Sequence, residues 1–242
     1  SSGAEGYVYG YNRWIAMKFF LDFESDLNRK LKLEKVEVLA QLKDANFTFP
    51  IGFVGYESGF KEGYYMDRVI PYDEENPTVL YAKNNFSTSE VRDILIGGDR
   101  ALQRVHSEGY FHGDIRDRNV LLDANKTLVF IDTDNGFYKG FDCDYPSHIA
   151  NSFYTTYWHV LSPSDNDKFM FALLALNTIL KGVKFYSHKS AEFYESIIGQ
   201  LNVSRAVKRE LLYIFSPKKD KPYIGPILES IDTEEPLIAI KK

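Results

Sequence analysis

The chain has 242 residues, of which 44% are hydrophobic and 15% are aromatic, enough for a sizeable core in one domain of two lobes or in two small domains. Its formal net charge of −5 argues against a nucleic-acid partner, and no stretch approaches the roughly 20 apolar residues that span a bilayer, so we expect no membrane segment. The single cysteine, Cys143, excludes an internal disulfide and favours a reducing compartment, so we expect a cytoplasmic protein, with secretion into a host cell as the alternative.

The first third of the chain is rich in predicted strands. Residues 7–9 and 14–20 combine aromatic and branched side chains, and two further strands, IGFVGYES and GYYMDRVI, are separated by the turn FKEG. Between the two pairs, apolar residues recur at helical spacing from Asp26 to Leu42. We expect this helix to bury the face that carries Leu27, Leu31, Val38 and Leu42.

Beyond Pro71 and Pro77 the pattern becomes helical. An amphipathic helix is predicted over 89–105, and residues 169–180 are apolar all round, which is typical of a buried core helix. Two more amphipathic helices are predicted over 206–215 and 224–231. The order of elements therefore predicts an α+β architecture with two lobes, residues 1–70 and 71–242, in one domain.

Polar residues concentrate around a predicted hairpin formed by VLL and LVFI. His112, Gly113 and Asp114 precede it, with Asn119 five residues after Asp114, and Asp132 directly follows its second strand. An aspartate and an asparagine on one short loop can face an acceptor and a metal ion, and a carboxylate that ends a buried strand is held rigidly. Phosphoryl transfer needs these groups, although a hairpin with polar turns is the simpler alternative.

The pattern H-G-D-x-x-x-x-N followed by I-D resembles the catalytic and metal-binding loops of the protein-kinase-like superfamily. The resemblance implies a bilobal fold, with an antiparallel sheet and one helix in an N-lobe whose first strand is missing from this chain, and a mainly helical C-lobe. It implies Asp114 as the carboxylate that orients the acceptor. It also implies Asn119 and Asp132 as ligands of Mg²⁺, or of Mn²⁺, which accompanies ATP.

The same resemblance implies a nucleotide site in the first third. Lys18, in IAMK, matches the strand lysine of the V-A-I-K pattern, with Ala16 two residues before it. Gly3, Gly6 and Val8 resemble the glycine-rich phosphate loop, with serine in place of its first glycine. A glycine run is also common in ordinary turns, and a strand lysine is often exposed to solvent.

Two further segments extend the resemblance. GYYM followed by DRV resembles the gatekeeper and hinge, so Met66 would border the adenine and the backbone groups of Asp67 and Val69 would pair with its edge. An ordinary strand that leads to a linker would look the same. Asp167, before the apolar helix, resembles the aspartate that braces the catalytic loop.

The resemblance also implies a glutamate that orients Lys18. Glu34 is predicted to point inward from the helix over 26–42, and Glu37 is the alternative. Arg116, two places after the catalytic aspartate, would act on the acceptor. Tyrosine kinases commonly carry arginine there, whereas serine/threonine kinases usually carry lysine, and a surface arginine is the alternative.

The chain departs from the pattern at Gly113, where many regulated kinases have arginine, and at Asp134, which replaces the glycine of D-F-G. Asp134 could reach a second metal ion or cap a turn. We expect an ATP-dependent protein kinase that acts on a protein substrate, with serine or threonine favoured and tyrosine as an option. The alternatives are a small-molecule phosphotransferase of the aminoglycoside-kinase type and a nucleotide-binding pseudokinase.

Overall fold

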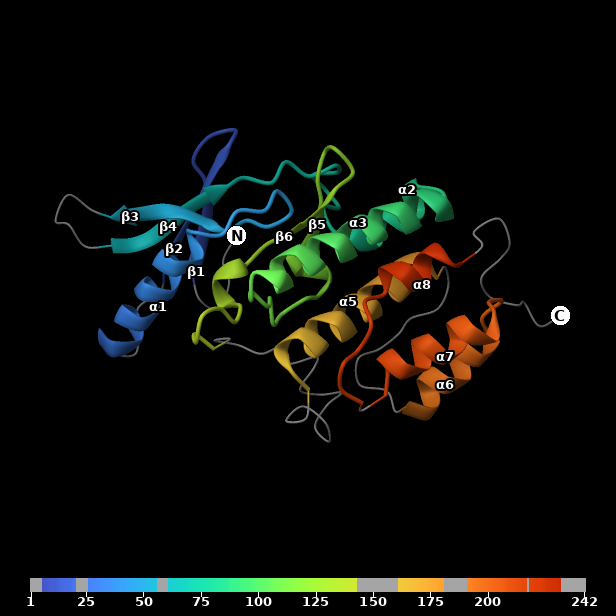
Figure 1. The fold of residues 1–242 in the computed structure, drawn as a ribbon. Coiled ribbons are helices and arrows are strands. Elements are labelled where there is room, and N and C mark those ends of the chain that lie inside the picture. The colour runs from blue at the N-terminus through green and yellow to red at the C-terminus, as the bar shows by residue number, and fades with distance from the viewer. Residues whose placement is uncertain are drawn as a thin grey trace.

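The computed structural model describes residues 6–20, 26–55, 61–142, 161–180, 191–216 and 218–231. Within these ranges the protein is α+β, with a small antiparallel sheet and several helices, which confirms the predicted fold class in general terms. Figure 1 shows the sheet and α1 (Asp26–Leu39) at one end of the molecule and α6 (Ala191–Gln200) and α7 (Arg205–Ile214) at the other. Among the described residues, none of the helices combines the length and the apolar character needed to cross a membrane.

The sheet has four strands in the order β1-β2-β4-β3. In this register Lys18 lies opposite Val8 on one side and Tyr64 on the other, so the three side chains share one face. That face carries a small hydrophobic cluster that includes Tyr64 and Met66, and Val36 of α1 packs into it. The strands are β1 (Gly6–Gly10), β2 (Ile15–Phe20), β3 (Pro50–Gly55) and β4 (Lys61–Asp67).

The predicted buried face of α1 is only partly correct. Leu27 and Leu31 are 63% and 45% exposed, whereas Val38 packs against the core and Leu42, beyond the end of the helix at Leu39, is buried. The buried positions follow the spacing i, i+3, i+4, i+7 of a helix packed on one side. They are Lys32, Lys35, Val36 and Leu39. The prediction failed because it counted only apolar residues, whereas long lysine side chains can bury their stems and carry the ammonium to a polar partner.

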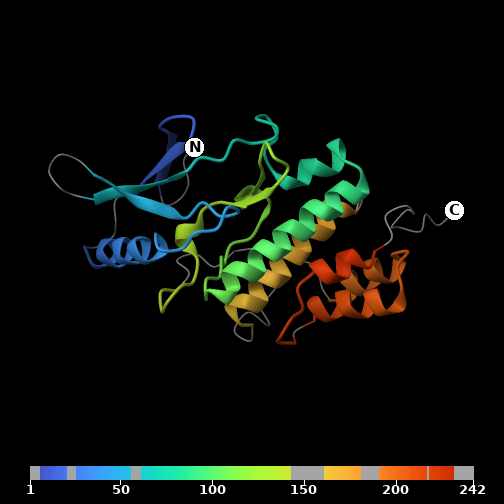
Figure 2. The same cartoon turned by 45° about the horizontal axis from the view of Figure 1, so that its top comes forward.

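The helical part is built around α5 (Pro163–Ile179), which is buried nearly all round, as the apolar run predicted. Ser162 caps its N-terminus by accepting a hydrogen bond from the Asp165 amide, and Pro163 takes the first helical position. Helix α3 (Thr88–Ser107) packs against α5 and α8 (Gly225–Glu229), and α6 packs against α7. Figure 2 shows α3 and α5 running side by side. The short α2 (Ala82–Asn85) and η1 (Val79–Tyr81) precede α3.

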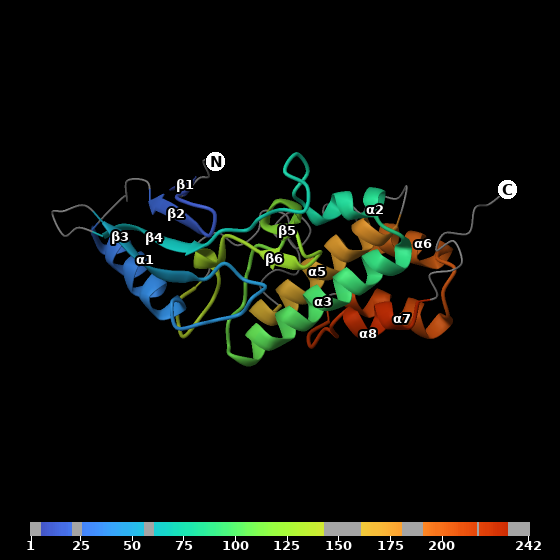
Figure 3. The ribbon, with the colours of Figure 1, turned by 90° about the horizontal axis from the view of Figure 1, so that it is seen from above.

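A two-stranded hairpin, β5 (Val120–Leu122) and β6 (Leu128–Phe130), lies between the sheet and the long helices (Figure 3). Aromatic rings join it to the chain that enters β3. Phe47 stacks on Phe130 with ring centroids 4.6 Å apart, and Phe49 meets Tyr110 edge-on at 4.9 Å. The hairpin is thereby fixed close beneath the sheet, and short 3₁₀ turns, η2 (Asp117–Asn119) and η3 (Thr133–Asn135), flank its two strands.

Candidate functional site

The loop between α3 and β5 is braced from two sides. Asp167, fully buried on α5, accepts hydrogen bonds from the backbone amides of His112 (2.6 Å) and Gly113 (2.8 Å). The His112 ring donates from Nε2 to the Ile131 carbonyl at 2.9 Å, which ties the loop to the end of β6. These contacts confirm the predicted bracing role of Asp167, and they hold the backbone before Asp114 in one conformation.

Gly113 has a positive φ of 76°, a conformation that residues with a Cβ rarely adopt. A residue with a side chain, such as arginine, would therefore be strained at this place in the loop.

The Asp114 carboxylate is buried and only half satisfied. Its Oδ2 accepts hydrogen bonds from Asn119 Nδ2 at 2.8 Å and from Arg116, and the same Asn119 nitrogen also donates to the Asp114 carbonyl at 2.9 Å. Its Oδ1 is buried without a hydrogen-bond partner in the described part of the chain. A buried acceptor without a donor is costly. Oδ1 is therefore the atom of this carboxylate that has capacity for a further hydrogen bond.

Asp132 immediately precedes η3 and lies two residues after β6, in the left-handed conformation (φ 61°, ψ 40°) that aspartate tolerates better than most residues. Its Oδ1 accepts a hydrogen bond from Lys18 Nζ at 2.6 Å, and its Oδ2 accepts one from Asn135 at 3.2 Å. The side chain is 34% exposed. The amide of Ile131 donates to the Asn119 carbonyl at 3.0 Å, so the backbone holds Asn119 beside the end of this strand. The structure thus brings together Lys18 and Asp132 as the sequence predicted.

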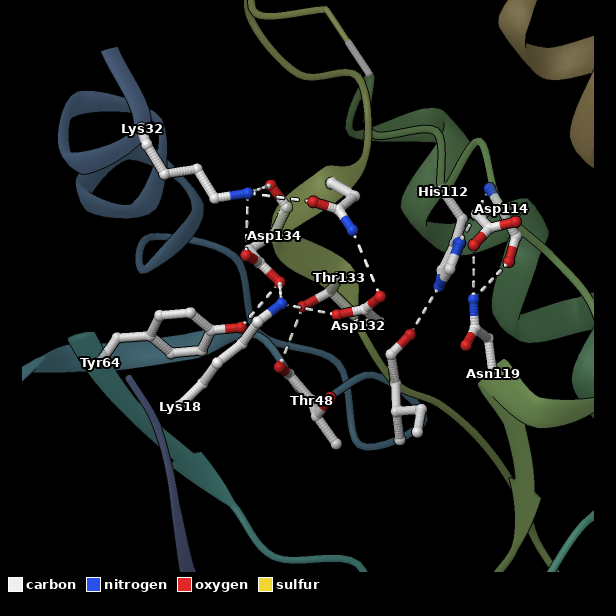
Figure 4. Close-up of polar contacts among 12 residues, drawn as sticks. Lys18, Lys32, Thr48, Tyr64, His112, Asp114, Asn119, Asp132, Thr133 and Asp134 are labelled. Atoms are coloured by element: carbon white, nitrogen blue, oxygen red, sulfur yellow. Dashed lines mark hydrogen bonds and ion pairs between the residues drawn. The ribbon is translucent and has the colours of Figure 1, made fainter. Parts of the chain in front are cut away.

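Lys18 has a second carboxylate partner, Asp134, whose side chain is fully buried (Figure 4). Asp134 Oδ1 accepts hydrogen bonds from Lys18 Nζ and from the Tyr64 hydroxyl, both at 2.8 Å. Its Oδ2 forms an ion pair with Lys32 Nζ at 2.9 Å, at an angle that is poor for a hydrogen bond. Asp134 therefore takes neither of the two roles expected from the sequence, since it is enclosed by cations and a hydroxyl.

The protonation state of Asp134 follows from these neighbours. Burial by itself would raise its pKa, but the charges of Lys18 and Lys32 outweigh burial and lower the pKa below the ordinary value. The carboxylate is therefore ionised in spite of being shielded from water.

The predicted pairing of Lys18 with Glu34 is wrong. The Glu34 side chain is 48% exposed and lies 3.8 Å from Lys30 on the outer side of α1. Glu37 is exposed as well. The physical reason is that the buried side of α1 carries Lys32 and Lys35, whereas both glutamates lie on its exposed side.

Lys32 and Lys35 are site residues that the sequence reasoning missed. Lys32 Nζ donates to the Asp134 carbonyl at 3.2 Å and to the Asn135 side chain at 3.0 Å. Lys35 Nζ donates to the carbonyls of Asn135 at 3.1 Å and Asp142 at 2.6 Å. The helical spacing of 32, 35, 36 and 39 was the available signal, had lysines been accepted as buried positions.

The structure groups some of the residues assigned to the nucleotide. Ala16 lies opposite Met66 in the register of β2 and β4, and both are buried in the same cluster, against which Val8 packs. Lys18 extends from the same face of β2, since its Cβ points to the side shared with Ala16. These four residues therefore line one surface of the sheet.

The remaining nucleotide assignments are more scattered. Gly6 begins β1, where a Cβ would meet the Phe19 carbonyl oxygen at 2.2 Å, so the strand pairing itself requires glycine. Asp67 ends β4 and is exposed, and Val69 follows it half-buried. Gly3 lies outside the described residues.

No protein-family model matches the chain, and a search among functionally characterised proteins found no match either. Within the described ranges, no group of three or more histidine, cysteine, aspartate or glutamate side chains is placed to hold a metal ion. The oxygen ligands assigned from the sequence are one carboxylate, Asp132, and one amide, Asn119. Mg²⁺ is commonly held by one or two protein carboxylates together with substrate phosphates, so this smaller donor set suits an ion that arrives with a nucleotide.

Proposed function

We propose that the chain is an ATP-dependent phosphotransferase of the bilobal, protein-kinase-like class, and that it transfers the γ-phosphate of ATP to a protein hydroxyl. The observation that carries the proposal is the Asp114 carboxylate. It is buried, it is held on Oδ2 by Asn119 and Arg116, and its Oδ1 has no hydrogen-bond partner among the residues that the structure describes. A structural aspartate in such a place would be expected to satisfy both oxygens.

The arrangement of the elements supports two lobes. The sheet and α1 form the N-lobe, and the chain from residue 71 onward forms the C-lobe. Lys18 and Tyr64 extend from the sheet to Asp132 and Asp134 at η3, and the loop that carries His112, Asp114 and Asn119 lies beside the same segment (Figure 4). A site for a nucleotide and an acceptor belongs at such a junction between two units.

The residues present fit ATP with Mg²⁺, or with Mn²⁺. Asp132 and Asn119 would hold the metal ion, because Asp132 is partly exposed and Asn119 directs its Nδ2 to Asp114, which makes the amide oxygen the atom available to a cation. Lys18 would contact the phosphates. When bound, the metal ion neutralises charge on the phosphoryl oxygens. Ala16, Val8 and Met66 supply the apolar surface for a base.

Asp114 acts on the acceptor. Its Oδ1 orients the incoming hydroxyl and accepts its proton, while Arg116 and Asn119 keep Oδ2 fixed. Serine or threonine is the favoured acceptor. Tyrosine is an option, because the geometry described for Asp114 does not depend on the length of the acceptor side chain.

Gly113 favours a second candidate, a small-molecule phosphotransferase of the aminoglycoside-kinase type. Its positive φ disfavours the arginine through which many protein kinases sense a phosphorylated segment, and the H-G-D sequence suits this second class equally well. A pseudokinase is the third reading, and Lys18, Asp114, Asn119 and Asp132 are all retained, which argues against it.

Incubation with ATP labelled on the γ-phosphate separates the three. The protein is mixed with Mg²⁺ and either a protein extract or a pool of small metabolites, and label is followed into each fraction. Label on protein supports the favoured function, and label on small molecules supports the second. ATP binding without transfer to either pool would identify a pseudokinase.

A further inference from the structure

Lys18 lies between two carboxylates, Asp132 at 2.6 Å and Asp134 at 2.8 Å, and neither of them belongs to α1. We propose that Asp134 is the positioning residue for Lys18, and that Lys32 couples this position to helix α1. The inference rests on the proposed function in one respect only, the assignment of Lys18 to the phosphates.

Asp134 collects donors from three separate elements. Lys18 comes from β2 and Tyr64 from β4, each at 2.8 Å, and Lys32 comes from α1 at 2.9 Å. Asp134 itself stands on η3, four residues after β6. One buried carboxylate therefore joins the sheet, the helix and the turn that carries the metal ligand Asp132.

The two carboxylates that share Lys18 differ in their surroundings. Asp132 is 34% exposed and is assigned to the metal ion, whereas Asp134 is fully buried. Asp134 is thus the partner that can stay with Lys18 while Asp132 serves the metal. Without the Asp134 charge, the buried ammonium groups of Lys18 and Lys32 would both lose a carboxylate partner, which is unfavourable.

The turn that carries Asp134 is fixed on both sides. Lys32 and Lys35 of α1 donate to the η3 carbonyls of Asp134 and Asn135. On the opposite side, the Tyr110 hydroxyl donates to the Thr133 carbonyl at 2.9 Å. A displacement of α1 would therefore move Asp134, and Lys18 would lose one of its two carboxylate partners. Helix α1 therefore affects Lys18 indirectly: Lys32 of α1 pairs with the Asp134 carboxylate on η3, and Asp134 pairs with Lys18.

The test measures the reactivity of Lys18 without any nucleotide. The protein is treated with a limiting amount of acetic anhydride at several pH values, and acetylation of Lys18 is quantified by peptide mass spectrometry. Only an amine that is released from its carboxylate partners reacts. Asp134→Asn removes one of the two carboxylates that hold Lys18, and because Asp132 remains we expect Lys18 to be acetylated about threefold faster or more.

Lys32→Met is expected to change the rate of Lys18 acetylation in the opposite direction. Removal of Lys32 leaves the Asp134 carboxylate with less positive charge around it, so it holds Lys18 more strongly and labelling is expected to be slower than in the wild type. Lys30→Met, on the exposed side of the same helix, and Glu34→Gln are the matched controls, and both are expected to leave the labelling of Lys18 unchanged. Circular dichroism establishes that each variant is folded. Tyr64→Phe, which removes only the hydrogen bond to Asp134, replaces Asp134→Asn if that variant does not fold, with faster labelling expected.

Several results would overturn the inference. Faster labelling of Lys18 in both Asp134→Asn and Lys32→Met would show that these substitutions only loosen the local packing around Lys18. Unchanged labelling in the variants at positions 134 and 64 would show that Asp134 does not position Lys18. An effect of Glu34→Gln on labelling as large as that of Asp134→Asn would show that Glu34 of α1 positions Lys18. Because labelling needs neither ATP nor turnover, these outcomes are independent of whether the wild type transfers phosphate.

Discussion

Asp132 and Asp134 stand two residues apart and have different environments. Asp132 is partly open to solvent and bound to one lysine, whereas Asp134 is enclosed by two lysines and a tyrosine. The two aspartates therefore differ in their surroundings and not in residue type: Asp132 keeps contact with solvent, whereas Asp134 is closed off by its partners.

Asp132→Asn is expected to remove the effect of Mg²⁺ on ATP binding. The wild type should bind ATP roughly tenfold or more tightly with Mg²⁺ than without it, because the carboxylate is the charged ligand of the ion. The variant should show nearly the same affinity in both conditions. Isothermal titration measures this, and a variant that keeps the full magnesium effect would remove Asp132 from the metal site.

The motifs singled out residues that the structure brings close together. Asp114 contacts Asn119, and Lys18 contacts Asp132, although the sequence had paired Lys18 with Glu34. Glu34 failed because a glutamate on a helix is common, and which face of α1 is buried depends on partners 100 residues away in η3. No local pattern contains those partners.

Short turns position the site more strictly than the long helices do. Gly136 ends η3, and a Cβ there would meet Tyr110 Cε2 at 2.5 Å and the Phe111 carbonyl oxygen at 2.6 Å. The amide of Phe137 donates to the same carbonyl at 2.7 Å, so the two segments cannot separate without losing this pairing. The close approach therefore depends on glycine.

Gly136→Ala is expected to destabilise the protein by about 1–3 kcal/mol, because the added methyl group collides with backbone. Gly97→Ala is the matched control. Gly97 lies on the exposed side of α3 with no atom within 4 Å of an added Cβ. Alanine there should stabilise the helix by roughly 0.5–1 kcal/mol. Urea unfolding of both variants gives the comparison, and equal stability of the two would contradict the packing described at η3.

At the scale of elements, the apolar run over 169–180 predicted α5 correctly, because a helix buried on all sides has a simple composition. Helix α1 was predicted less well, because a pattern of apolar residues does not identify buried lysines. Its buried face includes Lys32 and Lys35, and their burial is offset by polar partners from elsewhere in the chain.

Across the whole molecule, Lys221 joins the C-terminal helices to the start of α5. It is buried, its Nζ donates to the carbonyls of Ile214 at 2.7 Å and Ser216 at 2.6 Å, and its amide donates to Asp165 at 2.8 Å. Burial lowers the pKa of Lys221 to about 8, against the opposing effect of Asp165. The folded protein therefore releases this proton more readily than the unfolded chain does.

This difference predicts a pH-dependent stability. Between about pH 8 and the ordinary lysine value near 10.4, the unfolded chain holds the proton and the folded protein does not, so raising the pH favours folding. Relative to Lys221→Met, the wild type should gain up to about 3 kcal/mol of unfolding free energy across this interval. Titration of other groups is common to both proteins and cancels. Urea unfolding at three pH values tests this, and a constant difference would contradict it.

The central claim is that Asp114 serves phosphoryl transfer at the junction of the sheet and the helical part. Transfer of the labelled γ-phosphate of ATP by the wild type and by Asp114→Asn, with Mg²⁺ and the same acceptor pool, tests it most directly. The account predicts transfer by the wild type and a loss of roughly 10²–10⁴-fold in the variant, with ATP affinity nearly unchanged because Asp114 faces the acceptor. Transfer by Asp114→Asn at the wild-type rate, or no transfer by the wild type to any acceptor pool, would contradict it.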